Sequence, residues 1–600
     1  MLKLLRLAAW TSVLCGAMCL PAGASAAPPQ AIRWQTQWSQ SAFDQASREH
    51  RFVLLDLHAV WCHWCHVMDE KTYANHEVIA LIDQHYIAVS IDADSDPGLA
   101  SRYADWGWPA TIVLAANGTE IVKRRGFIPP EQMASLLQAI LDDPTPGPSV
   151  RRSAPPVLAG SALVTQVQRA AFIKTYNDAY DAKYGGWGGG QKFIDAATMQ
   201  YTLARVEERD ALAARRARQT LDANLKLIDP LWGGVYQYSE TVDWNTPHYE
   251  KILSFEADDM RLYSEAYARW HDARYLEAAR ALQRYMDAFL KSPDGAFYVS
   301  QDADLSAAIT GHDYYRRGEA ARRHLGIPKV DTHEYARENG WAVVGFCALY
   351  DVTGDAAALA DAERAADWVL AQRALRGGGF RHDAKDSGGP YLDDTVSMGQ
   401  AFLALYRSTG ERRWLERARA AADYVATEFR DLRGGFTAAP PPSRAPGVFG
   451  DPLRTIEQNA AVARFANLLA RYTGDARYRQ SALYALRFLA AASAGIESEQ
   501  LHAEILLADR ELANAPIHIT VVGGKTDPVA RALHTAALRF PADYVQIDWW
   551  DRSEGPLPNS EIQFPHLTRP AAFACTQSTC SNPVYDPGSI APTVNAALYQ

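Results

Sequence analysis

The chain has 600 residues, of which 48% are hydrophobic and 22% are charged, and its formal net charge is −10 at pH 7. This is the composition of a globular protein and excludes a largely disordered chain, while the length predicts several domains rather than a single core. The acidic balance, with no long basic run, argues against nucleic acid as a partner.

The N-terminus has the pattern of a cleavable export signal over residues 1–26. Lys3 and Arg6 precede an apolar stretch from Leu7 to Leu20, and Ala24-Ser25-Ala26 forms a small-residue cleavage site. The apolar stretch is too short to span a membrane comfortably. We therefore predict an exported protein, periplasmic or secreted, with no membrane span after signal cleavage.

Residues 31–143 are predicted to form a thioredoxin-like α/β domain. The pattern is a buried strand, helical sequence, a second buried strand, two strands joined by an Asn-Gly turn, and a closing helix. The segments are residues 51–58, 65–73, 77–84, 86–91, 109–114, 120–123 and 130–141. This order of strands and helices is that of thioredoxin.

The first junction of strand and helix carries Cys62-His63-Trp64-Cys65, the spacing of a redox dithiol. The positive end of the helix dipole stabilises a thiolate at Cys62. A protonated His63 would act in the same direction and make the disulfide more oxidising. We predict that Cys62 is the attacking thiolate and that Cys65 is the resolving thiol.

Two further positions support a redox site. Asp56 lies six residues before Cys62, where thioredoxin-like proteins carry a buried acid that helps to move the proton during exchange. Trp108-Pro109 resembles the proline of that fold whose preceding peptide bond is cis and lies against the dithiol. Asp56 and Pro109 are therefore included among the predicted catalytic residues.

Other interpretations of the same motif stay open. Cys-x-x-Cys-His is also the attachment signal for haem c, with His66 as the axial ligand. A metal bound by Cys62, His63, Cys65 and His66 and a permanent structural disulfide are further alternatives. A thioredoxin fold leaves no room for a porphyrin against this helix, so we expect a redox-active disulfide and no other cofactor.

A proline-rich linker, residues 144–158, precedes a helical body over residues 159–510. Two kinds of link alternate in this body: short polar turns that follow an aromatic helix end, and Gly-aromatic loops. The short turns lie near residues 270–275, 350–355, 406–414 and 472–478, and the loops near residues 184–187, 232–235, 294–297, 378–380 and 433–436. The alternation predicts about six helical hairpins that close into an (α/α)6 toroid.

Acidic residues and a histidine gather near the Gly-aromatic loops and could perform acid/base chemistry on a sugar. They are His248, Glu250, Asp302, Asp304, Asp393 and Asp394. Asp and Glu also suit helix caps and arginine partners without any catalysis, and spacing alone does not decide between these roles.

Residues 511–600 are predicted to form a small α/β segment, with strands at residues 517–522 and 544–547 around a helix at 527–539. Cys575 and Cys580 could form a disulfide across a short turn, and a structural pairing is favoured over a second redox pair. Cys347, in an apolar helical context, is expected to be a buried core residue.

The chain resembles the thioredoxin-domain family typified by spermatogenesis-associated protein 20 and its bacterial relatives. The resemblance rests on Trp61 to Met68, Gly107 to Pro109, Gly188 to Phe193, Pro247 to Leu253, Phe297 to Asp304, Tyr391 to Asp394 and Phe573 to Pro587. It implies a thioredoxin-like domain joined to a toroid similar to N-acylglucosamine 2-epimerases. Ser254 to Ala257, Glu338 to Gly340 and Thr455 to Asn459 depart from the family pattern, so the resemblance implies architecture more directly than activity.

Three functions follow as hypotheses. The first is an exported thiol–disulfide oxidoreductase that acts on protein thiols or a redox partner protein, with the toroid selecting the substrate. The second is a carbohydrate isomerase, epimerase or hydrolase that uses the toroid carboxylates. The third makes the toroid a non-catalytic module that binds a glycan or a peptide.

Overall fold

The structure is a computed structural model that describes residues 31–150, 163–386, 388–440, 445–493, 501–559, 563–576 and 579–598. The predicted export signal lies outside these residues. No helix in the described part of the chain has the length and apolar character that a membrane crossing requires.

The N-terminal domain is built on a four-stranded sheet in the order β2-β1-β3-β4. Strand β1 (Phe52–His58) pairs in parallel with β2 (Tyr86–Asp92) and antiparallel with β3 (Ala110–Leu114), and β3 pairs antiparallel with β4 (Glu120–Arg125). The helices are α1 (Gln40–Glu49), α2 (His63–Lys71), α3 (His76–His85), α4 (Pro97–Tyr103) and α5 (Pro130–Asp142). The predicted thioredoxin-like order is confirmed, with α1 and α4 added to it.

Alternation along β1 explains why both faces of this sheet are covered. Leu54 packs with α3 and α5 on one face, whereas Leu55 and Leu57 pack with α1 on the other. Side chains of neighbouring strand residues point to opposite faces, so an unbroken apolar run predicts a strand that is buried on both sides. The carboxyl end of β1 is therefore fixed rigidly where the dithiol follows.

The helical body is a closed ring of helix pairs. Among the described residues, the inner helices are α7 (Ala196–Glu207), α9 (Leu253–Trp270), α13 (Ala336–Thr353), α15 (Leu392–Thr409), α17 (Ile456–Thr473) and α19 (Ala503–Ala513). The outer helices are α6 (Gln166–Asp178), α8 (Ala211–Asn224), α10 (Ala273–Tyr285), α14 (Ala356–Gln372), α16 (Arg412–Glu428) and α18 (Ala476–Ala492). Each inner helix contacts the next, and α19 contacts α7, which closes the ring. The predicted toroid is confirmed.

The sixth helix pair joins the two ends of the ring. Helix α6 at the start of the body packs against α19 at its end. The other five pairs are sequential hairpins, which the alternating links predicted. The closing pair joins segments more than 300 residues apart, so a local pattern of links cannot reveal it.

The two kinds of link lie at opposite ends of the ring. The inner helices α13, α15 and α17 each end at a glycine with a left-handed backbone, and the outer helix follows at once. Each Gly-aromatic loop is closed by a single β-bridge: Tyr180 with Trp187, Ile228 with Val235, Lys291 with Phe297, Ala374 with Phe380, and Arg430 with Phe436. These loops precede the inner helices and form the rim that carries the acidic residues.

Short strands shape this rim further. Strand β5 (Tyr238–Ser239) pairs with β6 (Pro247–His248), and β8 (Ser300–Gln301) pairs with both β7 (Lys251–Ile252) and β9 (Val330–Asp331). Helices α11 (Gly311–Tyr315) and α12 (Glu319–Leu325) lie between β8 and β9.

The C-terminal segment contains a three-stranded sheet in the order β11-β10-β12. Its elements are β10 (Ile517–Val522), α20 (Pro528–Leu538), β11 (Val545–Trp550), β12 (Ala571–Cys575) and α21 (Ile590–Leu598). The sequence predicted β10, α20 and β11 but not β12. Tyr406, near the end of α15, donates a hydrogen bond to Asp548 Oδ1 at 2.9 Å, which fastens this sheet to the toroid.

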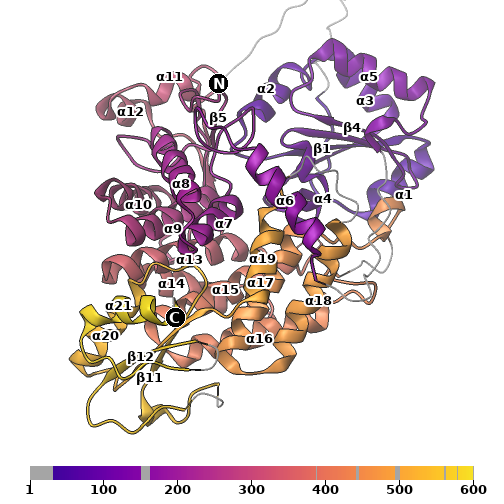
Figure 1. Ribbon diagram of the computed structural model, residues 1–600. Helices are drawn as coiled ribbons and strands as arrows, with labels where there is room; N and C mark the ends of the chain where they lie inside the picture. Colours follow the sequence, from indigo (N-terminus) through magenta and orange to yellow (C-terminus); the bar gives the residue numbers. More distant parts are fainter. Residues whose placement is uncertain are drawn as a thin grey trace, which may run out of the picture.

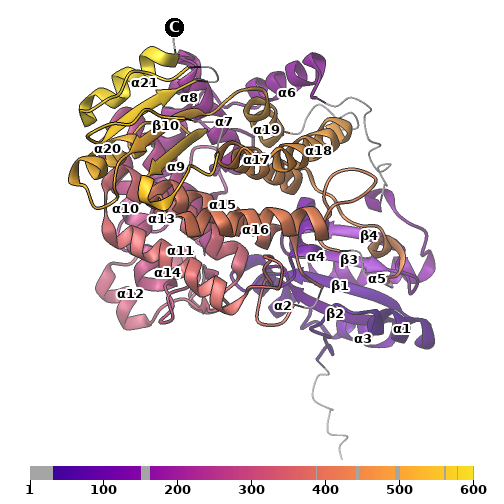
Figure 2. The same ribbon diagram turned by 90° about the horizontal axis from the view of Figure 1, so that it is seen from below.

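The two α/β units lie on opposite sides of the toroid (Figures 1 and 2). The thioredoxin-like domain, in indigo, contacts the rim at the N-terminal ends of the inner helices, whereas the C-terminal sheet, in yellow, contacts their C-terminal ends. The rim with the candidate toroid acids is therefore the one that the dithiol domain covers.

Candidate functional site

Cys62 and Cys65 form a disulfide at the start of α2. Cys62 is the N-cap residue of this helix, and its Sγ accepts a hydrogen bond from the Cys65 backbone N–H at 3.1 Å. Unpaired N–H groups and the helix dipole favour negative charge at this position. The N-cap position that the sequence predicted for Cys62 is confirmed.

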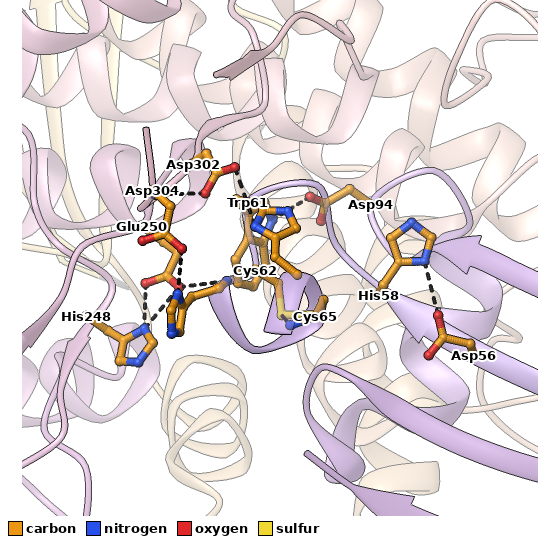
Figure 3. Close-up of a disulfide and its surroundings, with 12 residues drawn as sticks. Asp56, His58, Trp61, Cys62, Cys65, Asp94, His248, Glu250, Asp302 and Asp304 are labelled. Atoms are coloured by element: carbon orange, nitrogen blue, oxygen red, sulfur yellow. Dashed lines mark hydrogen bonds and ion pairs between the residues drawn. A yellow bond between two sulfur atoms is a disulfide. The ribbon is translucent and has the colours of Figure 1, made fainter. Parts of the chain in front are cut away.

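A buried polar network lies behind the dithiol on β1 (Figure 3). Asp56, 3% exposed, accepts hydrogen bonds from Tyr73 Oη and Ser90 Oγ, both at 3.0 Å, and lies 3.6 Å from His58 Nδ1. Burial lowers the pKa of His58, but Asp56 more than offsets this and raises it. Burial also raises the pKa of Asp69, on α2, to about 6. Asp56, His58 and Asp69 thus place three ionisable groups on the strand and helix that flank the dithiol.

The loop before β3 also reaches the disulfide. The peptide bond between Trp108 and Pro109 is cis. Trp108 packs against a buried cluster that contains both cysteines, Trp61 and the toroid residue Ile252. Pro109 itself is buried at the start of β3.

The toroid rim covers the dithiol. Ile252 belongs to the same buried cluster as Cys62 and Cys65, and Phe255 on α9 packs against it. The exposed fractions of Cys62 and Cys65 are 4% and 3%. The sulfur atoms therefore lie between two domains rather than on an open face of one.

Carboxylates of the toroid bind the first turn of α2 (Figure 3). The His63 backbone N–H donates to Glu250 Oε1 at 3.3 Å, and His63 Nδ1 lies 2.5 Å from Asp304 Oδ2. The hydrogen bond to Asp304 raises the pKa of His63. Burial raises the pKa of Asp304, but the hydrogen bond from His63 and other contacts more than offset this and lower it.

The remaining rim groups complete the cluster. His248 Nδ1 lies 2.8 Å from Glu250 Oε2, and His248 Nε2 lies 3.0 Å from Glu240 Oε1. His66 Nδ1 lies 3.7 Å from Asp302 Oδ2. Burial raises the pKa of Asp302 to about 7 and lowers the pKa of His66. Four of the six toroid candidates, His248, Glu250, Asp302 and Asp304, thus meet the dithiol helix.

Asp394 lies deeper and is linked to the dithiol through three other residues. Its Oδ1 contacts His382 Nδ1 at 2.9 Å, and His382 Nε2 lies 2.7 Å from the backbone carbonyl of Asp94. Asp94 Oδ2 in turn accepts a hydrogen bond from Trp61 Nε1 at 2.7 Å. Burial opposes the charge of His382, but Asp394 raises its pKa to about 9. This chain of contacts joins the toroid to the residue that precedes Cys62.

Asp393 has a structural contact in the same interface. Its Oδ2 accepts a hydrogen bond from Gln458 Nε2 at 2.8 Å, and Gln458 also reaches Ser101 Oγ of α4 at 3.4 Å. Asp393 therefore supports domain contact and does not join the group around His63.

Sequence reasoning missed Asp94 and His382. Asp94 belongs to the run Asp92-Ala-Asp-Ser-Asp96 at the carboxyl end of β2, next to the end of β1 in a parallel pair. That position was a readable signal for a group near the dithiol. His382 lies two residues after the Gly-aromatic loop at residues 378–380, but only the ring closure brings it to the other domain.

A pocket of about 250 Å³ opens beside the dithiol helix. Its lining includes His63, Trp64, His248, Tyr249 and Asp304, so both domains contribute to it. The pocket combines aromatic rings, imidazoles and carboxylates, and one of its lining residues, His63, directly follows Cys62. This arrangement can hold a small polar molecule or a side chain near the start of the dithiol helix.

The other cysteines lie elsewhere. Cys575 and Cys580 form a disulfide at the end of β12, in the C-terminal sheet on the far side of the toroid. Cys347 is a buried free thiol on α13, and burial raises its pKa. Neither site shares a residue with the group around Cys62.

Comparison with known proteins agrees with this two-part architecture. Residues 25–142 match the family model Thioredox_DsbH, described as "Protein of unknown function, DUF255". The chain is 27% identical to spermatogenesis-associated protein 20 of Mus musculus over 302 residues, which cover 44% of this chain and 38% of that protein. The resemblance seen in the sequence is thereby confirmed, although the match spans well under half of the relative's length.

Two further similarities were found. Over 84 residues, 14% of each chain, the protein is 32% identical to the thiol:disulfide interchange protein DsbD of Pseudomonas fluorescens. The structure of cellobiose 2-epimerase from Bacillus thermoamylovorans B4167 matches with a TM-score of 0.42 at 10% identity, over 54% of this chain and 86% of that one.

Proposed function

We propose that the protein is an exported thiol–disulfide oxidoreductase whose toroid selects the substrate of the Cys62–Cys65 pair. The observation that carries this proposal is the disulfide at the N-cap of α2, with Asp56 buried on the strand that leads into it. Structural disulfides have no need of a helix start, whereas a reactive thiolate gains from it.

The proposed exchange proceeds in two displacements. A substrate thiolate attacks Sγ of Cys62, the bond to Cys65 breaks, and Cys65 leaves as a thiolate that takes up a proton. A second substrate thiolate then attacks the mixed disulfide and releases Cys62. Two substrate thiols become one disulfide while the enzyme disulfide becomes a dithiol. A redox partner protein outside this chain would reoxidise it, and the reverse sequence would reduce a substrate disulfide.

The toroid contacts refine the role predicted for His63. Asp304 raises the pKa of His63 and so favours the protonated imidazole, which in turn favours a thiolate at the neighbouring Cys62. The Asp304 carboxylate lies 2.5 Å from His63 Nδ1. Its negative charge partly offsets the effect of the positive imidazole on Cys62. We infer that the toroid, through this pair, adjusts how oxidising the dithiol is.

The covering of the dithiol bears on which substrates can react. With Cys62 only 4% exposed, a folded protein would reach its sulfur only after the two domains separate. A small thiol, or a flexible segment that enters the pocket beside His63 and Trp64, has a shorter route.

Exchange activity measured with and without Cys62 tests the proposal. The full-length protein and its Cys62→Ser variant would be compared in the oxidation of a small dithiol, the reduction of insulin and the refolding of a reduced protein. We expect activity in at least one assay that is lost in the variant. Equal rates for the two proteins in all three assays would exclude the function.

One observation favours a second candidate, a carbohydrate-active toroid. Asp302 has a pKa of about 7, whereas that of Asp304, two residues away, is lowered. A protonated and an ionised carboxyl group side by side are typical of general acid and base pairs. A glycan screen with Asp302→Asn and Glu250→Gln, each made in the Cys62→Ser background, would test it. Turnover that survives Cys62→Ser and is lost in both rim variants is the expected result.

A further inference from the structure

His66 is the residue of the Cys-x-x-Cys-His motif that thiol exchange does not use. Its Nδ1 faces the toroid, and with carboxylate oxygens of Asp302 and Asp304 it forms a group of donor atoms that all lie within 4.8 Å of one another. His66 comes from α2, whereas the two aspartates follow β8 on the rim. One imidazole and two carboxylates form a donor set suited to Zn²⁺ and to other divalent first-row metals.

One oxygen of the Asp302 carboxylate faces His66. The side chain is 8% exposed, and its Oδ1 accepts a hydrogen bond from the Asp304 backbone N–H at 3.0 Å. Within the described part of the chain, Oδ2 has no hydrogen-bond partner. It faces His66 Nδ1 at 3.7 Å, which is too long for a hydrogen bond. An oxygen of a largely buried carboxylate that accepts no hydrogen bond is available to a cation.

The spacing fits a shared metal ion. Zn²⁺ lies about 2.0–2.2 Å from imidazole nitrogens and carboxylate oxygens, so two tetrahedral ligands are about 3.3–3.5 Å apart. The observed 3.7 Å between His66 Nδ1 and Asp302 Oδ2 is close to this separation. Three protein ligands would leave the fourth tetrahedral position to water or another small ligand.

The surrounding residues hold the carboxylates in place. Asp304 Oδ1 accepts a hydrogen bond from the Gly311 backbone N–H at 2.7 Å, and its Oδ2 contacts His63. A Cβ at Gly311 would lie 2.8 Å from the Ala303 carbonyl oxygen, so only glycine brings this N–H so close to Asp304. The Asp302 backbone N–H donates to the Lys329 carbonyl at 2.8 Å. Outer contacts of this kind orient metal ligands.

We propose that His66, Asp302 and Asp304 bind one divalent metal ion, for which Zn²⁺ is the best match, and that this ion joins the dithiol helix to the toroid. This site differs from coordination by Cys62 and Cys65, because its ligands are available while the disulfide is intact. Since its ligands come from both domains, the ion would stabilise the docked arrangement that covers the dithiol. The proposal does not depend on the redox activity of the cysteines.

Metal binding by the full-length oxidised protein tests this site. After treatment with a chelator, the protein would be titrated with Zn²⁺ in competition with a chromophoric chelator, and bound zinc would be counted by elemental analysis. We expect one high-affinity ion per chain and a rise in the thermal midpoint on its addition. Asp302→Asn and His66→Gln should each weaken binding about tenfold or more and abolish the thermal shift.

Two controls separate this site from other ligands. Glu457, His502 and Glu504 form a second group with suitable spacing, so Glu504→Gln is a matched control that should keep the affinity of the wild type. The double variant Cys62→Ser/Cys65→Ser should also retain the ion. Absence of a high-affinity ion in the wild type would overturn the proposal, and so would unchanged binding in both Asp302→Asn and His66→Gln, or loss of the ion in Glu504→Gln or in the cysteine variant.

Discussion

His63 Nδ1 lies 2.5 Å from Asp304 Oδ2, although 241 positions separate the two residues in the chain. His63 is the first residue of the dithiol helix, and Asp304 belongs to the rim of the toroid. The two groups that the sequence suggested for different chemistries, a redox motif and a set of sugar-type acids, therefore form one interface.

Removal of the Asp304 carboxylate should lower the pKa of His63. The hydrogen bond to Asp304 is the main cause of the raised pKa, so an NMR titration of Asp304→Asn should place the His63 transition below that of the wild type. The pair is partly exposed, and its loss should reduce the free energy of unfolding by only about 1 kcal/mol. The exposed Asp313→Asn is a suitable control. An unchanged His63 transition would contradict the assignment of this contact.

The buried pair of His382 and Asp394 should make stability depend on pH. The pKa of His382 in the folded protein is about 9, above the ordinary value of 6.5. Its stabilising contribution should therefore be complete below about pH 6.5 and should be lost as the pH rises towards 9. Urea unfolding at pH 6.5 and pH 9 would measure this loss.

Disruption of the His382–Asp394 pair is the control for the pH dependence of the free energy of unfolding. Asp394→Asn should lower the free energy of unfolding by about 3 kcal/mol at pH 6.5, because it leaves a buried imidazolium without its counter-charge. The variant should also lose most of the difference between pH 6.5 and pH 9. A variant with the same pH dependence as the wild type would show that His382 is not the group responsible.

Much of this arrangement could be predicted from sequence, and the remainder depends on closure of the ring. The apolar run of β1 and the spacing of Cys62 and Cys65 are local signals, so the thioredoxin-like order and the dithiol position followed directly. The links with glycine likewise predicted about six hairpins, of which five are sequential pairs in the structure. The pairing of α6 with α19 and the contact of His382 with Asp94 join residues hundreds of positions apart. No local pattern encodes which rim of the toroid the first domain covers.

The same reasoning explains the mixed outcome for the acids. His248, Glu250, Asp302 and Asp304 were chosen because they lie near Gly-aromatic loops, and these loops share one rim. Asp393 and Asp394 also lie at that rim, but they belong to the first turn of α15, where they bind Gln458 and His382 instead. The sequence placed all six residues near one set of loops. It could not show which of them meet the dithiol helix and which bind Gln458 or His382.

The cover over the dithiol should limit the access of bulky reagents. For each reagent, we compare its rate with Cys62 of the reduced protein to its rate with free cysteine. We expect this relative rate to be higher for a small alkylating agent than for a bulky maleimide. Ile252→Ala removes part of the apolar contact that the toroid makes with the dithiol. It should reduce the difference between the relative rates of the two reagents. The substitution should also cost about 2 kcal/mol of stability. Leu212→Ala, at an exposed position on α8, is the control. Equal relative rates for both reagents in the wild type would contradict the burial of Cys62.

Asp56 should affect the rate of exchange rather than the fold. Its position on β1, where it accepts hydrogen bonds from Tyr73 and Ser90, suits a proton acceptor for the resolving thiol. Asp56→Asn keeps the shape of the side chain and should slow exchange about 100-fold at pH 7. The exposed Asp105→Asn should leave the rate unchanged. Stopped-flow tryptophan fluorescence of Trp61 and its neighbours would follow the reaction, and a wild-type rate in Asp56→Asn would remove this residue from the mechanism.

The reduction potential of the Cys62–Cys65 pair tests the central claim most directly. It would be measured by equilibration with glutathione buffers in the Cys575→Ser/Cys580→Ser background, so that only one disulfide responds. Because the helix start and protonated His63 stabilise the thiolate, we predict a reversible two-electron transition at a potential above about −300 mV. A pair that stays oxidised below about −300 mV would behave as a structural disulfide and would contradict the proposed function.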